Sequence, residues 1–228
     1  MKYFTYKMDL LVLNILAVIL ITIMIFFTYF ITGSISFIDS INVFSLIFII
    51  IILFIHEILH GIGFFILGKV KRKSIVFGAE LEKGIFYCMC KEPVSKVNIL
   101  VALSFPLFFI GILTYIIGIF LGSDLLILLS IFNISGSIGD ILMLIDILLM
   151  PKDICYLDLD DTTSFTILSK EDLSKKRYFS LKLEKYGKYS DNVKAKDYTK
   201  IKVSKSSKWI FIILIIFIII AFIDLLVT

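Results

Sequence analysis

The sequence predicts an all-α polytopic membrane protein: five transmembrane helices with a small cytoplasmic β-hairpin insert and a small cytoplasmic α+β segment. Of its 228 residues, 59% are hydrophobic and only 18% are charged, whereas soluble domains average about 45–50% apolar and about 25% charged residues. The mean hydropathy is +1.02. A chain of this size cannot bury so much apolar surface in one core, so the composition excludes a soluble globular enzyme and a disordered chain.

Five long apolar runs supply the expected helices. A helix needs about 20 mostly apolar residues to cross the hydrocarbon core of a bilayer, and the runs of about this length are Leu10–Ile31, Ile41–Gly68, Asn98–Leu121, Leu125–Met150 and Trp209–Val227. The first run is longer than the roughly 7–15 residues of a signal-peptide core, so we expect a retained anchor. The runs predict a four-span membrane core over 1–150, a cytoplasmic segment over 151–207 and a C-terminal fifth transmembrane helix over 208–228.

The basic residues predict how the chain is oriented. All 23 Lys and Arg residues lie in three segments: two before the first run, seven from Lys69 to Lys96 and fourteen from Lys152 to Lys208. Because cytoplasmic loops are enriched in basic residues, the N-terminus is expected in the cytoplasm and the C-terminus outside. We expect an integral protein of a prokaryotic cell membrane. The net charge of +4 thus reflects topology, and no nucleic-acid partner is expected.

Alternating apolar residues predict short strands between the spans. In the insert over 69–97, Ser74–Leu81 and Ile85–Cys90 flank the turn sequence Glu82-Lys83-Gly84 and predict the β-hairpin. In the segment over 151–207, Thr162–Leu168 and Tyr178–Glu184 predict two further strands. All three cysteines fall on this cytoplasmic side, where disulfides are not expected; they are Cys88, Cys90 and Cys155.

The two histidines of the chain form one motif inside the second apolar run. The sequence His56-Glu57-Ile58-Leu59-His60 places the imidazoles four residues apart, so both project from one helix face about one turn apart. This spacing lets two ring nitrogens reach one zinc ion, with the Glu57 carboxylate beside the open coordination position. Ionisable groups inside a span are expensive and mark functional sites. The alternative is that these polar groups only hold helices together by hydrogen bonds.

A catalytic zinc ion takes three protein ligands, and the chain has no third histidine. A carboxylate or a cysteine must complete the set, and the carboxylate candidates are, in order, Asp140, Asp146 and Glu80. The expected depth in the membrane favours Asp140. His56 lies fifteen residues beyond Ile41 and Asp140 lies fifteen beyond Leu125, so both are roughly 22 Å below the outer boundary at 1.5 Å per residue.

The helix face of the fourth run favours the same aspartate. Asn133 and Asp140 share one polar stripe, whereas Asp146 lies about 240° around the helix from Asp140. Gly136 and Gly139 would let another helix approach closely. We therefore expect Asp140 to be the third metal ligand. Asn133 is expected to contact the substrate or the ligand shell, or else to make an interhelical hydrogen bond.

At these motifs the sequence resembles the zincin peptidases, a family of integral membrane proteins akin to the site-2 proteases. The segments that carry the resemblance are 56–61 (HEILHG), 101–106 (VALSFP) and 133–140 (NISGSIGD), within a similar region over residues 40–170. The resemblance implies zinc held by His56, His60 and an aspartate, with Glu57 as the acid–base residue. It also implies cleavage of membrane-anchored substrates in or near the bilayer. Site-2 proteases commonly have a glycine after the aspartate, whereas Asp140 is followed by Ile141.

These features predict a zinc metalloprotease, specifically a zinc-dependent membrane-embedded endopeptidase of the site-2 protease type. Zinc is the expected cofactor, and a membrane-anchored or membrane-proximal protein or peptide in the lipid bilayer is the expected substrate. Glu57 would act as general base and acid on the water that attacks the peptide. Two alternatives stay open: a non-catalytic metal-binding pseudo-protease that acts as a sensor or scaffold, and an ion or proton carrier that uses its buried carboxylates.

Overall fold

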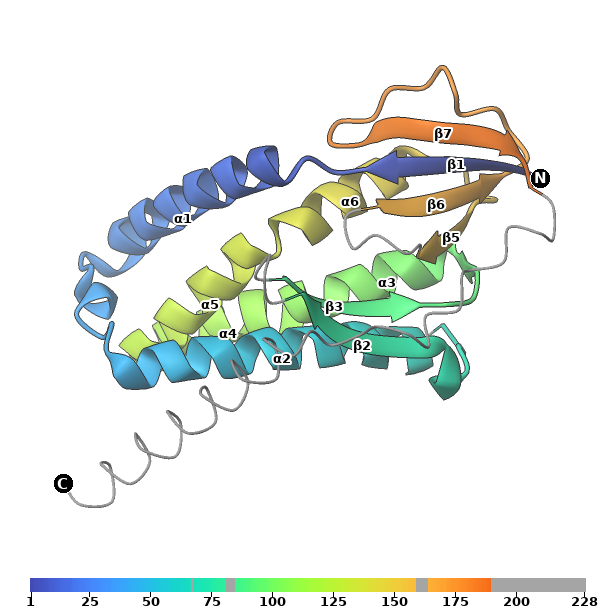
Figure 1. Ribbon diagram of the computed structural model, residues 1–228. Helices are drawn as coiled ribbons and strands as arrows, with labels where there is room; N and C mark the ends of the chain where they lie inside the picture. The colour runs from blue at the N-terminus through green and yellow to red at the C-terminus, as the bar shows by residue number, and fades with distance from the viewer. Residues whose placement is uncertain (67, 81–84, 159–163, 190–228) are drawn as a thin grey trace.

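The chain folds into a bundle of helices with an antiparallel β-sheet at one end (Figure 1). The computed structural model describes residues 1–66, 68–80, 85–158 and 164–189. Its helices are α1 (Leu10–Thr32), α2 (Val43–Ile66), α3 (Lys96–Pro106), α4 (Thr114–Leu121), α5 (Asp124–Gly136) and α6 (Ile138–Leu149), with the short helices η1 (Ser36–Ile38) and η2 (Arg72–Ser74) and the π-helix η3 (Leu107–Leu113). Its strands are β1 (Lys2–Lys7), β2 (Ile75–Glu80), β3 (Ile85–Cys90), β4 (Val94–Ser95), β5 (Cys155–Asp158), β6 (Ser164–Ser169) and β7 (Lys182–Lys188).

Five strands form the larger sheet, in the order β4-β5-β6-β1-β7; β1 is N-terminal, β4 comes from the middle of the chain, and the other three lie between residues 155 and 188. The N-terminal strand β1 lies between β6 and β7, so that Lys2 is opposite both Ser169 and Lys188. The prediction of an all-α protein with five transmembrane helices is therefore wrong. The prediction failed because β1 pairs only with strands more than 150 residues away in sequence, and no local pattern reveals such pairing.

Among the described residues, three helical segments are long and apolar enough to cross a membrane: α1, α2 and the continuous stretch Lys96–Leu121 formed by α3, η3 and α4. The pair α5 and α6 passes the same test only as one span bent by 50°. The bend follows from Ser137, whose backbone (φ −77°, ψ 11°) leaves the helical region. Its hydroxyl donates to the Asn133 carbonyl at 2.7 Å, a local bond that competes with the helical ladder. The predicted fifth span, Trp209–Val227, lies outside the described residues.

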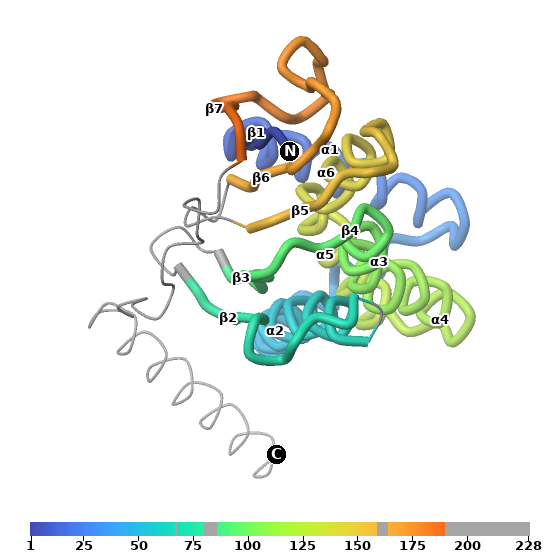
Figure 2. Tube along the Cα trace, turned by 90° about the vertical axis from the view of Figure 1, so that its right-hand side faces the viewer, coloured from blue at the N-terminus to red at the C-terminus, as the bar shows by residue number. Residues whose placement is uncertain are grey.

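The hairpin predicted in the first insert is present as β2 and β3, paired from Ile75 with Cys90 to Glu80 with Ile85. It lies between α2 and the edge of the larger sheet at β5, as the two views in Figures 1 and 2 agree. The other two predicted strands correspond to β6 and β7, the latter beginning at Lys182 rather than at Tyr178. The hairpin thus joins the membrane helices to the sheet.

One face of the sheet forms the main core against α3 and α6. The largest side chains with less than 2% exposure include Phe4, Tyr6, Phe165, Ile99 and Ile147. Burying an aromatic or aliphatic side chain of this size stabilises the fold by about 1.5–3 kcal/mol. The sheet and the two helices therefore form one hydrophobic unit.

Asp146, which the sequence ranked second as a metal ligand, instead anchors a loop. Its carboxylate is fully buried and accepts hydrogen bonds from the backbone N–H of Phe179 at 2.7 Å and from the N–H and hydroxyl of Ser180 at 2.9 and 2.5 Å. The turn of α6 that follows Asp140 is thereby fixed to the segment that leads into β7. Asp146 therefore connects the helix bundle to the segment that leads into the sheet.

Replacing Asp146 with alanine is expected to destabilise the protein by about 2–4 kcal/mol, because two backbone N–H groups and one hydroxyl lose their buried charged acceptor. The measurement is thermal or denaturant unfolding of the full chain in detergent micelles. Asp153→Ala, which removes an exposed carboxylate nearby in sequence, serves as the matched control and should leave the midpoint unchanged. An equal midpoint for the two variants would contradict the anchoring role.

Candidate metal centre

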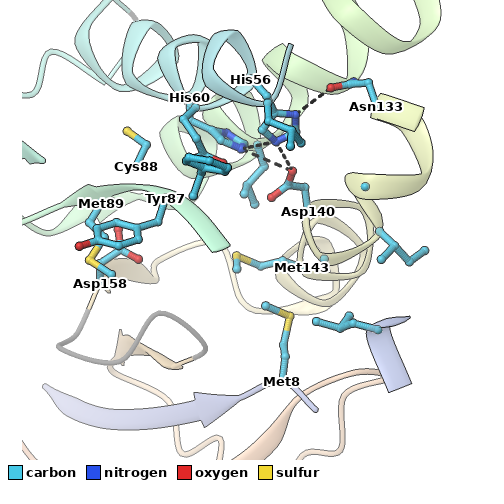
Figure 3. A pocket seen from close by; sticks show the side chains of 18 of the residues that line it. Met8, His56, His60, Tyr87, Cys88, Met89, Asn133, Asp140, Met143 and Asp158 are labelled. Carbon is cyan, nitrogen blue, oxygen red and sulfur yellow. Dashed lines mark hydrogen bonds and ion pairs between the residues drawn. The ribbon is translucent and has the colours of Figure 1, made fainter. Parts of the chain in front are cut away.

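A cavity of about 460 Å³ lies where α2, α5, α6, β3 and β5 meet (Figure 3). The start of α1 borders it with Leu10, Leu13 and Asn14. Its described charged lining is entirely acidic apart from the two histidines, and comprises Glu57, Asp140 and Asp158. The cavity therefore brings the histidine motif together with carboxylates from two other parts of the chain.

The middle of α2 supplies both imidazoles from one helix face, because residues 56 and 60 are separated by about one turn. Both histidines are buried. Their Nε2 atoms are 3.1 Å apart, and both point toward Asp140 (Figure 3). The rings are tilted by 79° to each other with centroids 4.8 Å apart, so they converge on one point rather than stack.

The Nδ1 atom of each imidazole faces a backbone or amide oxygen. His60 Nδ1 lies 2.9 Å from the carbonyl oxygen of Ala102, and His56 Nδ1 lies 3.0 Å from Oδ1 of Asn133. Asn133 is held in this orientation because its Nδ2 donates to the Pro106 carbonyl at 3.2 Å. Both oxygens only accept, so Nδ1 is the donor in each ring, and each neutral ring presents its Nε2 lone pair to the cavity.

Pro106 explains why the Ala102 carbonyl is available to a histidine. Proline has no N–H, so it cannot donate the i to i−4 helical bond to Ala102, and its ring disfavours regular helix at that point. The chain continues from Pro106 into the π-helix η3, a rare arrangement that is frequent at functional sites. The proline in the third apolar run thus frees the acceptor that orients His60.

Asp140 lies in the first turn of α6, just after the bend. Its Oδ2 is 3.1 Å from His56 Nε2 and 3.4 Å from His60 Nε2. The bend turns the first residues of α6 relative to α5, yet Asn133 before it and Asp140 after it both contact His56. The structure therefore brings together His56, His60, Asn133 and Asp140, four of the five residues singled out from the sequence.

The donor set of this centre fits a zinc ion. Two Nε2 lone pairs and one carboxylate oxygen converge with separations of 3.1, 3.1 and 3.4 Å. Ligand atoms bound about 2.0–2.1 Å from one tetrahedral ion lie about 3.3 Å apart. With both rings neutral, three acceptors at this spacing repel one another unless a cation or a proton lies between them. Imidazole nitrogens with a carboxylate oxygen are ligands that zinc accepts in catalytic sites.

Glu57, the fifth residue, completes a second possible set. The ligand atoms of His56, Glu57 and His60 all lie within 4.8 Å of one another. Because Glu57 follows His56 directly, its side chain projects about 100° around α2 from the histidine, toward β3, where the backbone of Cys88 approaches the carboxylate. Asp140 Oδ2 lies 3.1 and 3.4 Å from the two imidazole Nε2 atoms, so Asp140 is a candidate for the third ligand, with the Glu57 carboxylate beside the group.

The other candidates for the third metal ligand are the cysteines and Glu80. Burial raises the pKa of the Cys90 thiol to about 12 and that of Cys88 still further, so neither is an activated thiolate in the metal-free protein. All three cysteines are free. Glu80 ends β2, and Glu82 lies outside the described residues.

Sequence reasoning missed the part of the cavity that the sheet contributes. Asp158, at the end of β5, accepts a hydrogen bond from the Cys90 backbone N–H at 2.7 Å and another from the Tyr156 hydroxyl. Burial raises the pKa of Asp158 to about 6. No local sequence pattern around Asp158 shows that β5 reaches the hairpin. Asp158 ties β3 to the sheet at the far side of the cavity from Asn133.

Comparison with known proteins gives one family. Residues 49–155 match the model of a family described as "Putative zincin peptidase". The matched region contains both histidines, Glu57, Asn133 and Asp140, and ends just before Asp158. No curated protein and no solved structure matches the chain significantly. The family match and the His-Glu-His group together support a zinc peptidase.

Proposed function

We propose that the chain is a zinc-dependent endopeptidase that cleaves membrane-anchored or membrane-proximal peptides. The observation that carries the proposal is the convergence of two imidazole Nε2 atoms and the Asp140 carboxylate within 3.1–3.4 Å, beside Glu57 in a cavity. A metal sensor or scaffold would need only the ligands. The additional carboxylate and the space for a substrate favour hydrolysis over these alternatives and over an ion carrier.

Each residue of the centre has a distinct task in this mechanism. His56, His60 and Asp140 would hold the zinc ion, which when bound would supply Lewis acidity for activating water near neutral pH and for polarising a peptide carbonyl. Glu57 takes a proton from the attacking water at a carboxylate oxygen and transfers it to the amine of the leaving peptide. Asn133 and the Ala102 carbonyl hold the two rings so that their Nε2 atoms stay directed at the metal.

The membrane setting is part of the proposal. The motif lies on α2, one of the helical segments with the length and apolar character of a membrane span. Placing charged groups inside a bilayer costs free energy. Burial in a polar cavity shared with other helices offsets that cost. A substrate that is already anchored in the membrane reaches such a site by diffusion in two dimensions. By the positive-inside rule we place the lysine-rich sheet and the hairpin in the cytoplasm of a prokaryotic cell.

The test is cleavage by the purified full chain in detergent micelles, with two probes: fluorescein-labelled casein and a single-span reporter peptide carrying a fluorophore and a quencher. We expect the zinc-loaded protein to cut the reporter. Chelation with 1,10-phenanthroline should abolish the cutting, and added zinc but not magnesium should restore it. Cleavage that persists at undetectable zinc content would refute the mechanism, and preference for casein would refute the membrane-anchored substrate class.

A further inference from the structure

The segment between β6 and β7 reaches the end of the sheet that faces the membrane helices. Strand β1 leads into α1, and Lys7 at the end of β1 is opposite Lys182 at the start of β7. Lys188, at the other end of β7, is opposite Lys2. The start of β7 is therefore the end nearest to α1, as Figure 1 also shows, and the residues just before it lie close to the level at which α1 begins.

Asp146 gives a second, independent measure of this level. Helix α6 ends at Leu149, so Asp146 lies about 4.5 Å before that end at 1.5 Å per residue. Its carboxylate accepts hydrogen bonds from the backbone N–H groups of Phe179 and Ser180. The backbone at Phe179 is therefore held beside the last turn of a helix whose apolar Leu148 and Leu149 side chains are exposed, which is where we expect the bilayer to meet the cytoplasm.

Residues 174–180, which we call the basic loop, are fixed by packing on both sides. Leu173 and Leu181, which flank the loop, are buried. Within it, the Tyr178 ring packs edge to face against Tyr6, with ring centroids 5.6 Å apart. The Phe179 side chain, by contrast, is 75% exposed. The loop therefore presents this phenylalanine outward on a backbone that is held in place.

Basic side chains precede the exposed phenylalanine. Lys175, Lys176 and Arg177 are all exposed. Lys176 forms an ion pair with Glu171 at 3.2 Å, whereas Lys175 and Arg177 have no carboxylate partner among the described residues. Lys and Arg side chains are attracted to anionic lipid headgroups, and aromatic rings are enriched at the headgroup level. The loop combines both features at the level where headgroups are expected.

We propose that the basic loop docks on anionic headgroups of the cytoplasmic leaflet, with the Phe179 ring inserted among them. The docking holds the near end of the sheet against the membrane, and with it β5, which borders the cavity of the metal centre. This inference goes beyond the proposed peptidase function and rests on the membrane setting of the helices, not on zinc or cleavage. An acidic soluble protein would meet the same charges, but the level of the loop favours the bilayer.

The experiment uses tryptophan as a depth probe in the full chain. The one native tryptophan, Trp209, is replaced by phenylalanine, and either Phe179→Trp or Tyr186→Trp is added. Tyr186 is an exposed aromatic residue of β7, four residues beyond Lys182 and thus about 14 Å further from the helices. Each chain is reconstituted into phosphatidylcholine vesicles with or without phosphatidylglycerol. The lipid acyl chains carry bromine near the headgroup, which quenches tryptophan only at short range.

We expect the vesicles that contain phosphatidylglycerol to quench the emission at position 179 and to leave position 186 unquenched. The loss should be smaller without phosphatidylglycerol. Raising the salt from about 0.1 M to about 1 M should also reduce it, because the screening length falls from about 10 Å to about 3 Å. Lys175→Gln with Arg177→Gln should reproduce the effect of salt. Lys185→Gln with Lys188→Gln, which changes exposed lysines of β7, is the matched control and should keep the full quenching.

The possible outcomes separate the docking from the other proposals. Equal quenching at the two positions would overturn insertion of Phe179, and no quenching at position 179 would assign the charges to a soluble acidic partner. Quenching that ignores phosphatidylglycerol and salt would overturn the role of anionic headgroups. None of these results affects the peptidase proposal, whose assay runs in detergent micelles. Release of the chain from the vesicles by alkaline carbonate would overturn the membrane setting and the docking together.

Discussion

Replacing Glu57 with glutamine is expected to abolish peptide cleavage while one zinc ion per chain remains bound. Glutamine has nearly the same size and polarity, but its amide cannot take up a proton from water. General acid–base groups contribute about 10²–10⁴-fold to rate, so the loss in kcat/KM should fall in this range. The measurement is cleavage of the single-span reporter by the zinc-loaded variant, with the zinc content determined on the same sample.

The control for Glu57→Gln is Glu171→Gln, which changes an exposed carboxylate of the sheet segment and should cleave at the wild-type rate. This substitution also distinguishes the functional alternatives. A variant that loses zinc with the cleavage would make Glu57 a ligand, as in the second possible set of His56, Glu57 and His60. A variant that cleaves normally would refute Glu57 as the acid–base residue.

Replacing His56 or Asp140 with alanine is expected to remove stoichiometric zinc. Each substitution takes away one of three converging donor atoms, and two remaining ligands do not hold zinc in a catalytic site. For Asp140→Ala we expect zinc affinity to fall by at least about 100-fold, since even the loss of an outer-shell partner costs about 10–100-fold. The measurement is metal analysis of purified protein after dialysis against a calibrated zinc buffer.

Asp124→Ala is the matched control for the zinc experiment. Asp124 lies in the first turn of α5, where its carboxylate accepts a hydrogen bond from Ser36, at the other end of the bent helix pair from the cavity. This variant should keep full zinc occupancy. Full occupancy in Asp140→Ala would show that another carboxylate completes the site, and loss of zinc from Asp124→Ala would show that the assay reports on folding.

The features that could be predicted from the sequence are those set by short-range periodicity. The spacing of His56 and His60 fixes both rings on one face of α2, and the alternation over residues 75–90 fixes the hairpin. The angle between Asp140 and Asp146 on a helix also separates two aspartates that the structure places in different surroundings. The structure places Asp140 against the two histidines and Asp146 against Phe179 and Ser180.

The features that could not be predicted depend on contacts between distant segments. The sequence does not show that the Ala102 carbonyl accepts a hydrogen bond from His60. Pro106 indicates only that this carbonyl lacks its helical hydrogen bond. The sheet was missed because β1 is six residues long and its partners begin at Ser164. A bend at Ser137 also divides the fourth apolar run into two helices, neither of which is long enough alone to be a span.

The central position of β1 has a consequence for biosynthesis. Residues 2–7 are translated more than 150 residues before β6 and β7, between which they pair. Helix α1 starts directly after this strand, capped by Asp9, and can enter the bilayer while the strand still has its backbone donors and acceptors exposed. Closing such a long loop is slow, so strand β1 must stay accessible on its own side of the membrane until β6 and β7 have been synthesised.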